Sequence, residues 1–298
     1  EWMNARVYAH STSLHTQIVR PEERTNTLHN KALGWGASIS EDFLAGQWQF
    51  NWQFALDARN RVEATEQEIT ALGETVFNRT NLLSRQQAWS FNLDTAKRWK
   101  SWEFTGGVRL AHMRQNDGAV SQQNIDDTNL SGFVGGKKRW SHEWSSGFYI
   151  SHGFRVPTLT ERFFSGSTPR GVTLGDPTLR PEKARNIQAD IAYSGDTLQF
   201  SASAFQQSID HYIERVALSP TTLKYTSLAG AKIDGVSYQA NWALSSYLSL
   251  TAQGQWLWAQ DNNGKPVNDV SPNQHDVKLG WQSATQSVWL NMTYREAH

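Results

Sequence analysis

Hydrophobic and polar side chains alternate along most of this chain of 298 residues. The clearest run covers residues 48–56, where large apolar side chains alternate with amides and one alanine; the apolar members are Trp48, Phe50, Trp52, Phe54 and Leu56. Successive residues of a β-strand point to opposite faces of a sheet. The run therefore predicts a strand with one apolar and one polar face, which suits lipid on one side and a wet lumen on the other. A half-buried strand of a soluble β-sandwich has the same period.

The same alternation recurs from end to end and predicts about thirteen strands. Their expected ranges are 4–19, 33–39, 48–56, 89–93, 102–110, 130–137, 144–154, 187–193, 198–213, 232–244, 248–258, 277–281 and 288–294. The connections between them alternate between short and long. An antiparallel membrane barrel has short turns at one rim and long loops at the other, whereas a Greek-key sandwich mixes its connection lengths. The pattern favours an all-β, up-and-down transmembrane barrel.

Polar stretches between these strands predict the loops. The expected loops are 20–30, 57–85 with a helical turn near 66–72, 114–127, 155–183, 216–223 and 261–274, and a turn is expected at 41–46. The short turns 97–100 and 137–142 carry lysine and arginine beside tryptophan, which is typical of a phospholipid headgroup layer. We therefore expect these two turns to face the periplasm and loops 57–85, 114–127 and 155–183 to lie outside the cell.

Composition is consistent with a barrel and narrows the function. The 28 basic and 28 acidic residues leave no net charge, so nothing indicates a nucleic-acid partner. Cysteine is absent, which excludes disulfides and thiolate metal sites. Only 38% of the residues are hydrophobic, yet 14 are tryptophan. A chain this polar with so many indoles fits lipid-facing strands flanked by aromatic girdles, and no segment has the roughly 20 consecutive apolar residues of a membrane helix.

The long loop 155–183 carries two motifs that resemble a known family. Gly-Phe-Arg-Val-Pro-Thr-Leu-Thr-Glu occupies residues 153–161, and Gly-Asp-Pro-Thr-Leu-Arg-Pro-Glu occupies residues 175–182. The pair resembles the signature of TonB-dependent outer-membrane receptors, in which a strand ends in Gly-Phe-Arg-x-Pro-Thr-x-x-Glu and the next follows Gly-Asn-Pro-x-Leu-x-Pro-Glu. Asp176 stands where that family usually has asparagine. Residues 200–213 and 231–238 are similar to two further strands of the family.

The resemblance implies an integral barrel in a Gram-negative outer membrane that binds outer-membrane lipids. It implies the 22-stranded, plugged type, so residues 1–298 correspond to one partial barrel domain without the plug and without the last strands. The family imports a scarce nutrient with energy from the TonB complex, which would act here through the missing N-terminal plug region. A passive porin or autotransporter-type barrel is the alternative.

The sequence contains no pattern for enzyme chemistry. The nine histidines are scattered without metal-ligand spacing, and no Gly-x-Ser-x-Gly motif is present. We therefore expect no catalytic residue, no bound metal and no cofactor. We expect Glu161 to hold the long loop together locally and His152 to lie at a strand end near the membrane interface.

The candidate ligand-binding residues are arginines and aromatic residues of the outer loops. Guanidinium groups bind carboxylates and catecholates in pairs of hydrogen bonds, and aromatic rings stack on planar ligands. The first set lies in the long loop and the second flanks the loop 216–223: Arg162, Phe163, Phe164 and Arg170, then Tyr212, Arg215 and Tyr225. This pattern favours a ferric siderophore as ligand. The resemblance supports the same ligand, because most members of the family import iron chelates and its haem receptors often place an iron-ligating histidine between the two motifs, whereas no histidine lies between Pro157 and Pro177. Haem and cobalamin are the alternatives, because His112, His152 and His211 fall near outer strand ends.

Overall fold

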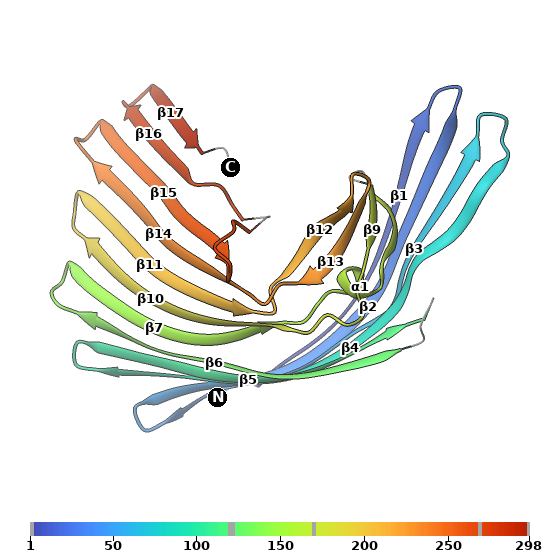
Figure 1. Cartoon of the computed structure of the whole chain (residues 1–298). Coiled ribbons are helices and arrows are strands. Elements are labelled where there is room, and N and C mark those ends of the chain that lie inside the picture. The colour runs from blue at the N-terminus through green and yellow to red at the C-terminus, as the bar shows by residue number, and fades with distance from the viewer. Residues whose placement is uncertain (1–2, 119–122, 169–170, 268–269, 297–298) are drawn as a thin grey trace.

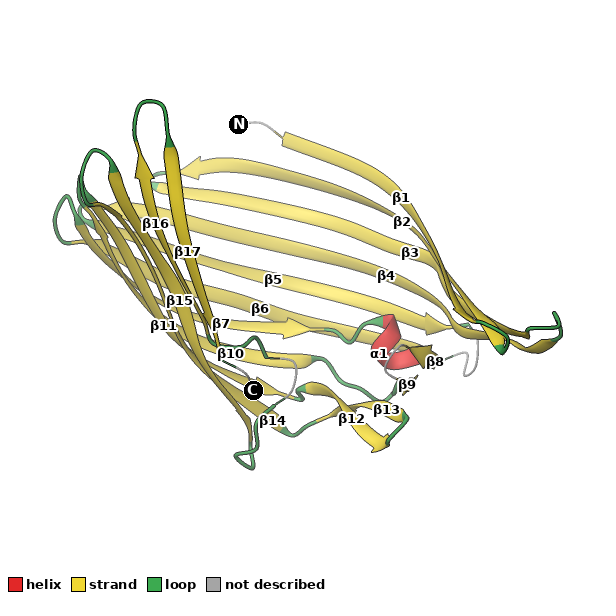
Figure 2. Cartoon of the chain, turned by 90° about the horizontal axis from the view of Figure 1, so that it is seen from above, coloured by secondary structure: helices red, strands yellow, loops and turns green. Residues whose placement is uncertain are grey.

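The computed structural model describes residues 3–118, 123–168, 171–267 and 270–296. Thirteen strands form one antiparallel sheet that curves into an open trough (Figures 1 and 2). In sheet order these are β1 (Met3–Arg20), β2 (Arg24–Ala45), β3 (Trp48–Thr70), β4 (Thr75–Trp99), β5 (Trp102–Asp117), β6 (Asn124–Arg139), β7 (Trp144–Arg155), β10 (Glu182–Ser194), β11 (Leu198–Asp210), β14 (Gly230–Ala243), β15 (Leu248–Asp261), β16 (Gln274–Gln282) and β17 (Ser287–Arg295). The predicted all-β fold of about thirteen strands is confirmed.

A small second sheet and the single described helix lie on the concave side of the trough (Figure 1). The helix α1 (Leu159–Phe163) and strands β8 (Ser165–Thr168) and β9 (Gly171–Leu174) belong to the long connection after β7. Strands β12 (Ile213–Ser219) and β13 (Thr222–Ser227) form a hairpin in the connection after β11, and β13 pairs with β9 in parallel. Two outer connections thus fold inward together over the concave face. Among the described residues, no helix has the length and apolar character needed to cross a membrane.

Contacts of the helix identify which side chains point to the concave face. Leu159 and Phe163 of α1 pack against Ala64 of β3 and Leu82 of β4. A β-bulge after Arg59 shifts the register of β3 by one residue. Odd-numbered residues before the bulge therefore point to the concave face, and beyond it the even-numbered residues do. Gln53 accordingly faces inward and accepts a hydrogen bond from Asn92 of β4.

The convex face carries the predicted apolar belt. By the same register, Trp48, Phe50, Trp52, Phe54 and Leu56 point outward, as predicted. Phe91, Val108 and Ile150 are likewise on this face and are 41%, 52% and 46% exposed. A continuous apolar surface of this kind is typical of contact with lipid.

Cations and indoles meet at the rim of short turns. The ammonium group of Lys97 lies 5.2 Å from the ring centroid of Trp48, and that of Lys138 lies 3.8 Å from Trp140 and 5.3 Å from Trp102. These contacts combine cation–π attraction with a cationic tip near the headgroups. The rim of short turns therefore carries the paired lysine and tryptophan side chains that were predicted for a phospholipid headgroup layer.

Several predicted loops are wrong, because the strands continue beyond the apolar belt. Residues 20–30 contain the end of β1, a turn of only three residues and the start of β2. Residues 57–85 form the end of β3, a turn and the start of β4, with no helical turn at 66–72, and residues 216–223 belong to the β12–β13 hairpin. The loop predicted at 114–127 is shorter than expected, because β5 runs to Asp117 and β6 begins at Asn124. The turn expected at 41–46 begins only after Ala45, where β2 ends. Where both faces of a strand meet water, no apolar alternation is left to indicate it.

Cysteine labelling would test which rim faces outward. In the complete receptor, we expect a membrane-impermeant maleimide to label Thr221→Cys on intact cells but to label His142→Cys only after the outer membrane is opened. Both positions are exposed, one in the turn after β12 and the other in the short turn before β7. Labelling of His142→Cys alone on intact cells would invert the predicted topology.

Candidate functional site

The long connection begins with a short capped helix. The hydroxyl of Thr158 accepts a hydrogen bond from the Glu161 amide at 3.2 Å, and the Glu161 carboxylate accepts one from the Thr158 amide at 2.7 Å. This reciprocal capping box fixes the first turn of α1. Pro157 precedes it and ends β7, because proline cannot donate to the strand ladder.

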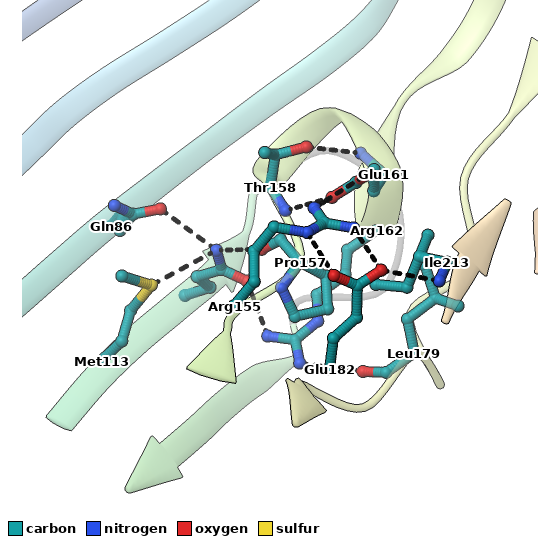
Figure 3. A network of polar contacts seen from close by, with 11 residues as sticks. Gln86, Met113, Arg155, Pro157, Thr158, Glu161, Arg162, Leu179, Glu182 and Ile213 are labelled. Carbon is teal, nitrogen blue, oxygen red and sulfur yellow. Dashed lines mark hydrogen bonds and ion pairs between the residues drawn. The ribbon is translucent and has the colours of Figure 1, made fainter. Parts of the chain in front are cut away.

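The two motifs recognised in the sequence meet at Arg155 (Figure 3). Its guanidinium donates to both oxygens of Glu182, at 2.6 and 2.8 Å, and to both oxygens of Glu161, at 2.9 Å each. Glu182 also accepts the amide of Ile213 at 2.7 Å, which attaches the β12–β13 hairpin. We call Arg155, Thr158, Glu161 and Glu182 the Arg155 network. The predicted local role of Glu161 in holding the loop is confirmed.

Arg162 forms a second, buried set of contacts on the concave face. Its guanidinium donates to Gln115 at 2.7 Å, to Asp127 at 2.8 Å and to the carbonyl oxygen of Leu179 at 2.8 Å. The side chain of Arg162 is 1% exposed, and that of Asp127 is 12% exposed. Gln115 also donates to the carbonyl oxygen of Pro157 at 2.9 Å. Arg162 thus joins both ends of the long connection to the barrel wall and has no open path to a ligand.

The aspartate that replaces the usual asparagine has a partner of its own. One oxygen of Asp176 accepts the amide and hydroxyl of Thr178, at 2.9 and 2.6 Å, and the other lies 3.0 Å from the ammonium group of Lys224 in β13. Burial alone would raise the pKa of Asp176, but these contacts lower it. The carboxylate therefore adds an ion pair between the loop and the β12–β13 hairpin.

Glu66 makes a third attachment, which the sequence did not indicate. This carboxylate is fully buried on the inner side of the β3–β4 hairpin and accepts hydrogen bonds from Asn26, Arg79 and Asn81 at 2.8 to 3.1 Å, and from the Ser167 amide at 3.4 Å. Burial alone would raise its pKa, but these donors outweigh it and lower the pKa to about 2. Glu66 thus ties β8 to the outer end of the barrel wall.

Acid should weaken this attachment in a defined pH window. Because the pKa of Glu66 is depressed on folding, its stabilisation is fully present above its ordinary value near 4.5 and is lost as the pH falls toward 2. We expect Glu66→Gln to increase protease cleavage within residues 156–181 at pH 7, and the difference from the unmodified receptor to shrink with acid. Glu74→Gln, at an exposed hairpin tip, is the control. Equal cleavage of both variants at pH 7 would contradict the assignment.

The structure places the predicted ligand-binding residues in different surroundings. Phe163 is 8% exposed in the cluster under α1, and Phe164 packs against that cluster, so both support the loop. Arg170 lies outside the described residues. Tyr212 directly precedes β12, and the Arg215 guanidinium lies 6.0 Å from the ring centroid of Tyr225 on the paired strand β13.

His152 lies near the outer end of β7 and points to the convex face, as expected of an interface residue. Within the described residues, no group of three or more His, Asp or Glu side chains could hold a metal ion.

The comparisons with known proteins agree with this architecture. The family described as TonB dependent receptor-like, beta-barrel matches residues 4–297, nearly the whole chain. The chain belongs to this family. It is therefore a β-barrel of the Gram-negative outer membrane, and its family and structural neighbours are transport receptors. The alternative of a soluble sandwich is thereby excluded.

Two curated relatives resemble parts of the chain. "Heme/hemopexin utilization protein C" of Haemophilus influenzae (strain 86-028NP) is 26% identical over 149 residues, which are 42% of this chain and 21% of that protein. "Hemoglobin-haptoglobin utilization protein B" of Neisseria meningitidis serogroup A is 24% identical over 172 residues, 47% of this chain and 21% of that protein.

Solved structures match almost the whole chain in fold. The copper transporter OprC has a TM-score of 0.80 at 16% identity, and the match covers 96% of this chain and 47% of that one. The ferric citrate transporter FecA has a TM-score of 0.73 at 13% identity, and the match covers 98% and 46%. The chain thus spans about half the length of these structures. At such identities the likeness concerns the fold alone.

Proposed function

We propose that this TonB-dependent barrel is part of a receptor that binds an iron chelate at the cell surface and imports it with energy from the TonB complex. One observation carries the proposal. Arg155, Arg162 and Glu66 attach the long connection to the wall, so that α1 and the small sheet stand inside the lumen rather than over lipid. Rigid inward-facing loops are suited to selective binding, and the chain performs no covalent chemistry in this proposal.

Haem is the first candidate ligand. The support comes from four relatives whose names refer to haem, haemopexin or haemoglobin. Without a histidine between Pro157 and Pro177, this segment offers no imidazole ligand to the haem iron. Other residues can still bind the porphyrin ring and its carboxylates. The burial of Arg162 also weakens the case for an anionic siderophore, because this guanidinium is already paired.

A ferric siderophore, which the sequence predicted, is the second candidate. It is favoured by Arg215 and Tyr225, which stand side by side on the inward hairpin with Tyr212 at its start. A guanidinium beside a phenol ring suits an anionic, partly planar chelate. Solved neighbours include receptors named for ferric yersiniabactin and ferric citrate.

Ligand titration of the complete receptor tests the proposal. We expect submicromolar binding of haemin, and we expect growth on haemin as sole iron source to require an intact TonB complex. Submicromolar binding of a ferric siderophore alone would select the second candidate, and Arg215→Ala should then weaken it, with Arg180→Ala as an exposed control from the long connection. Binding of cobalamin alone, of no chelate, or growth without TonB would contradict the proposal.

A further inference from the structure

The inner surface of β1–β3 contains polar and aromatic side chains that no motif indicated. Tyr8 and His10 of β1 point to the concave face, as do Asp57 and Arg59 of β3. The Tyr8 hydroxyl donates a hydrogen bond across β2 to the Asp57 carboxylate, which is possible only if both side chains share one face. We call Arg6, Tyr8, His10, Asp57 and Arg59 the Tyr8 surface.

Two glycines of β2 let the rings of this surface lie flat on the sheet. A Cβ atom at Gly36 would stand 2.5 Å from the Tyr8 ring, and one at Gly34 would stand 2.5 Å from the His10 ring. With no side chain at either position, both rings lie down over β2. Their centroids are 6.3 Å apart and their planes differ by 20°, so they form a nearly flat aromatic surface that faces the lumen.

Cations lie beside this aromatic surface. The Arg6 guanidinium is 5.4 Å from the centroid of the Tyr8 ring, and Arg59 stands opposite Gly34 in the register, next to His10. Both arginines are exposed, and Tyr8 is 37% exposed. A flat aromatic surface with a guanidinium on each side is complementary to a planar ring system that carries carboxylates.

The Tyr8 surface lies on the same hydrogen-bonded row of the sheet as the attachment of the long connection. His10, Gly34, Arg59, Gln86 and Gln115 occupy one register row across β1 to β5. Gln115 is the residue that contacts Arg162 and Pro157. At about 4.8 Å per strand, the row places the surface roughly 19 Å along the wall from the long connection. Both features therefore belong to the wall of one lumen, four strand spacings apart.

We propose that the Tyr8 surface binds a haem-type tetrapyrrole, with its ring stacked on Tyr8 and His10 and its carboxylates paired with Arg6 and Arg59. This inference rests on the proposed function and names part of its ligand site. The contacts are to the ring and the carboxylates, so they do not depend on the iron. Iron-free protoporphyrin IX should therefore use the same surface as haemin.

The test is a titration of the complete receptor with haemin and with protoporphyrin IX, followed by absorbance and tryptophan quenching. We expect Tyr8→Ala and Arg59→Gln each to weaken both ligands at least tenfold. Gly36→Val keeps Tyr8 but displaces its ring, and it should act like Tyr8→Ala. Arg59→Gln should have no effect on the dimethyl ester of haemin, which lacks the paired charges.

Lys278→Gln is the matched control. Lys278 is another cation on the concave face, 5.2 Å from the ring centroid of Trp289, but it lies in β16 near the opposite end of the sheet. Affinities within twofold of the unmodified receptor in all three variants would overturn the Tyr8 surface while leaving iron-chelate import intact. An equal loss in Lys278→Gln would also overturn it. If the unmodified receptor binds no chelate at all, the proposed function fails first, and the Tyr8 surface fails with it.

Discussion

Replacing Arg162 with alanine is expected to destabilise the long connection by about 3–5 kcal/mol, the usual range for breaking a buried ion pair. The change would leave Asp127 without its cation, and it would also remove the donor to the Gln115 side-chain oxygen and to the Leu179 carbonyl oxygen. Because the loop can open without the barrel, the effect should appear as faster hydrogen exchange over residues 156–181.

Arg180→Ala is the matched control for this experiment. Arg180 lies in the second motif, but it is exposed, and surface changes of this kind stay within about 0.5 kcal/mol. If Arg162 instead contacted the ligand directly, its replacement would lower ligand affinity while exchange in the loop stayed unchanged. That result would contradict the structural role assigned here.

The barrel was predictable from sequence wherever one strand face meets lipid. The alternation in residues 48–56 identified the outward residues correctly, because lipid accepts only apolar side chains on that face. Beyond the belt, β3 continues to Thr70 with polar residues on both sides. Its pairing with β4 is made by backbone hydrogen bonds, which do not depend on the hydropathy of the side chains. The bulge after Arg59 also exchanges the residues that point to the two faces.

The site was predictable only where its contacts are local. Glu161 caps its own helix three residues away, so its role followed from the motif. The side-chain partners of Arg162 are 35 and 47 residues distant in the sequence. The residue type is the same whether an arginine is buried or binds a ligand. Glu66, Tyr8 and Asp57 depend in the same way on pairing across strands. A residue type alone does not reveal such partners.

The lipid-facing assignment leads to a graded prediction for arginine substitutions in β3. Phe54 lies between Ile39 and Phe91 on the convex face, so Phe54→Arg should lower the free energy of unfolding in lipid bilayers by about 2–4 kcal/mol. Trp52→Arg should lower it less, because the Glu41 carboxylate, 3.1 Å from the Trp52 indole nitrogen, offers the new cation a partner. Gln53→Arg, on the concave face, should have the smallest effect. Denaturant titration of the complete receptor refolded into vesicles measures all three, and a larger loss for Gln53→Arg than for Phe54→Arg would reverse the assignment of the two faces.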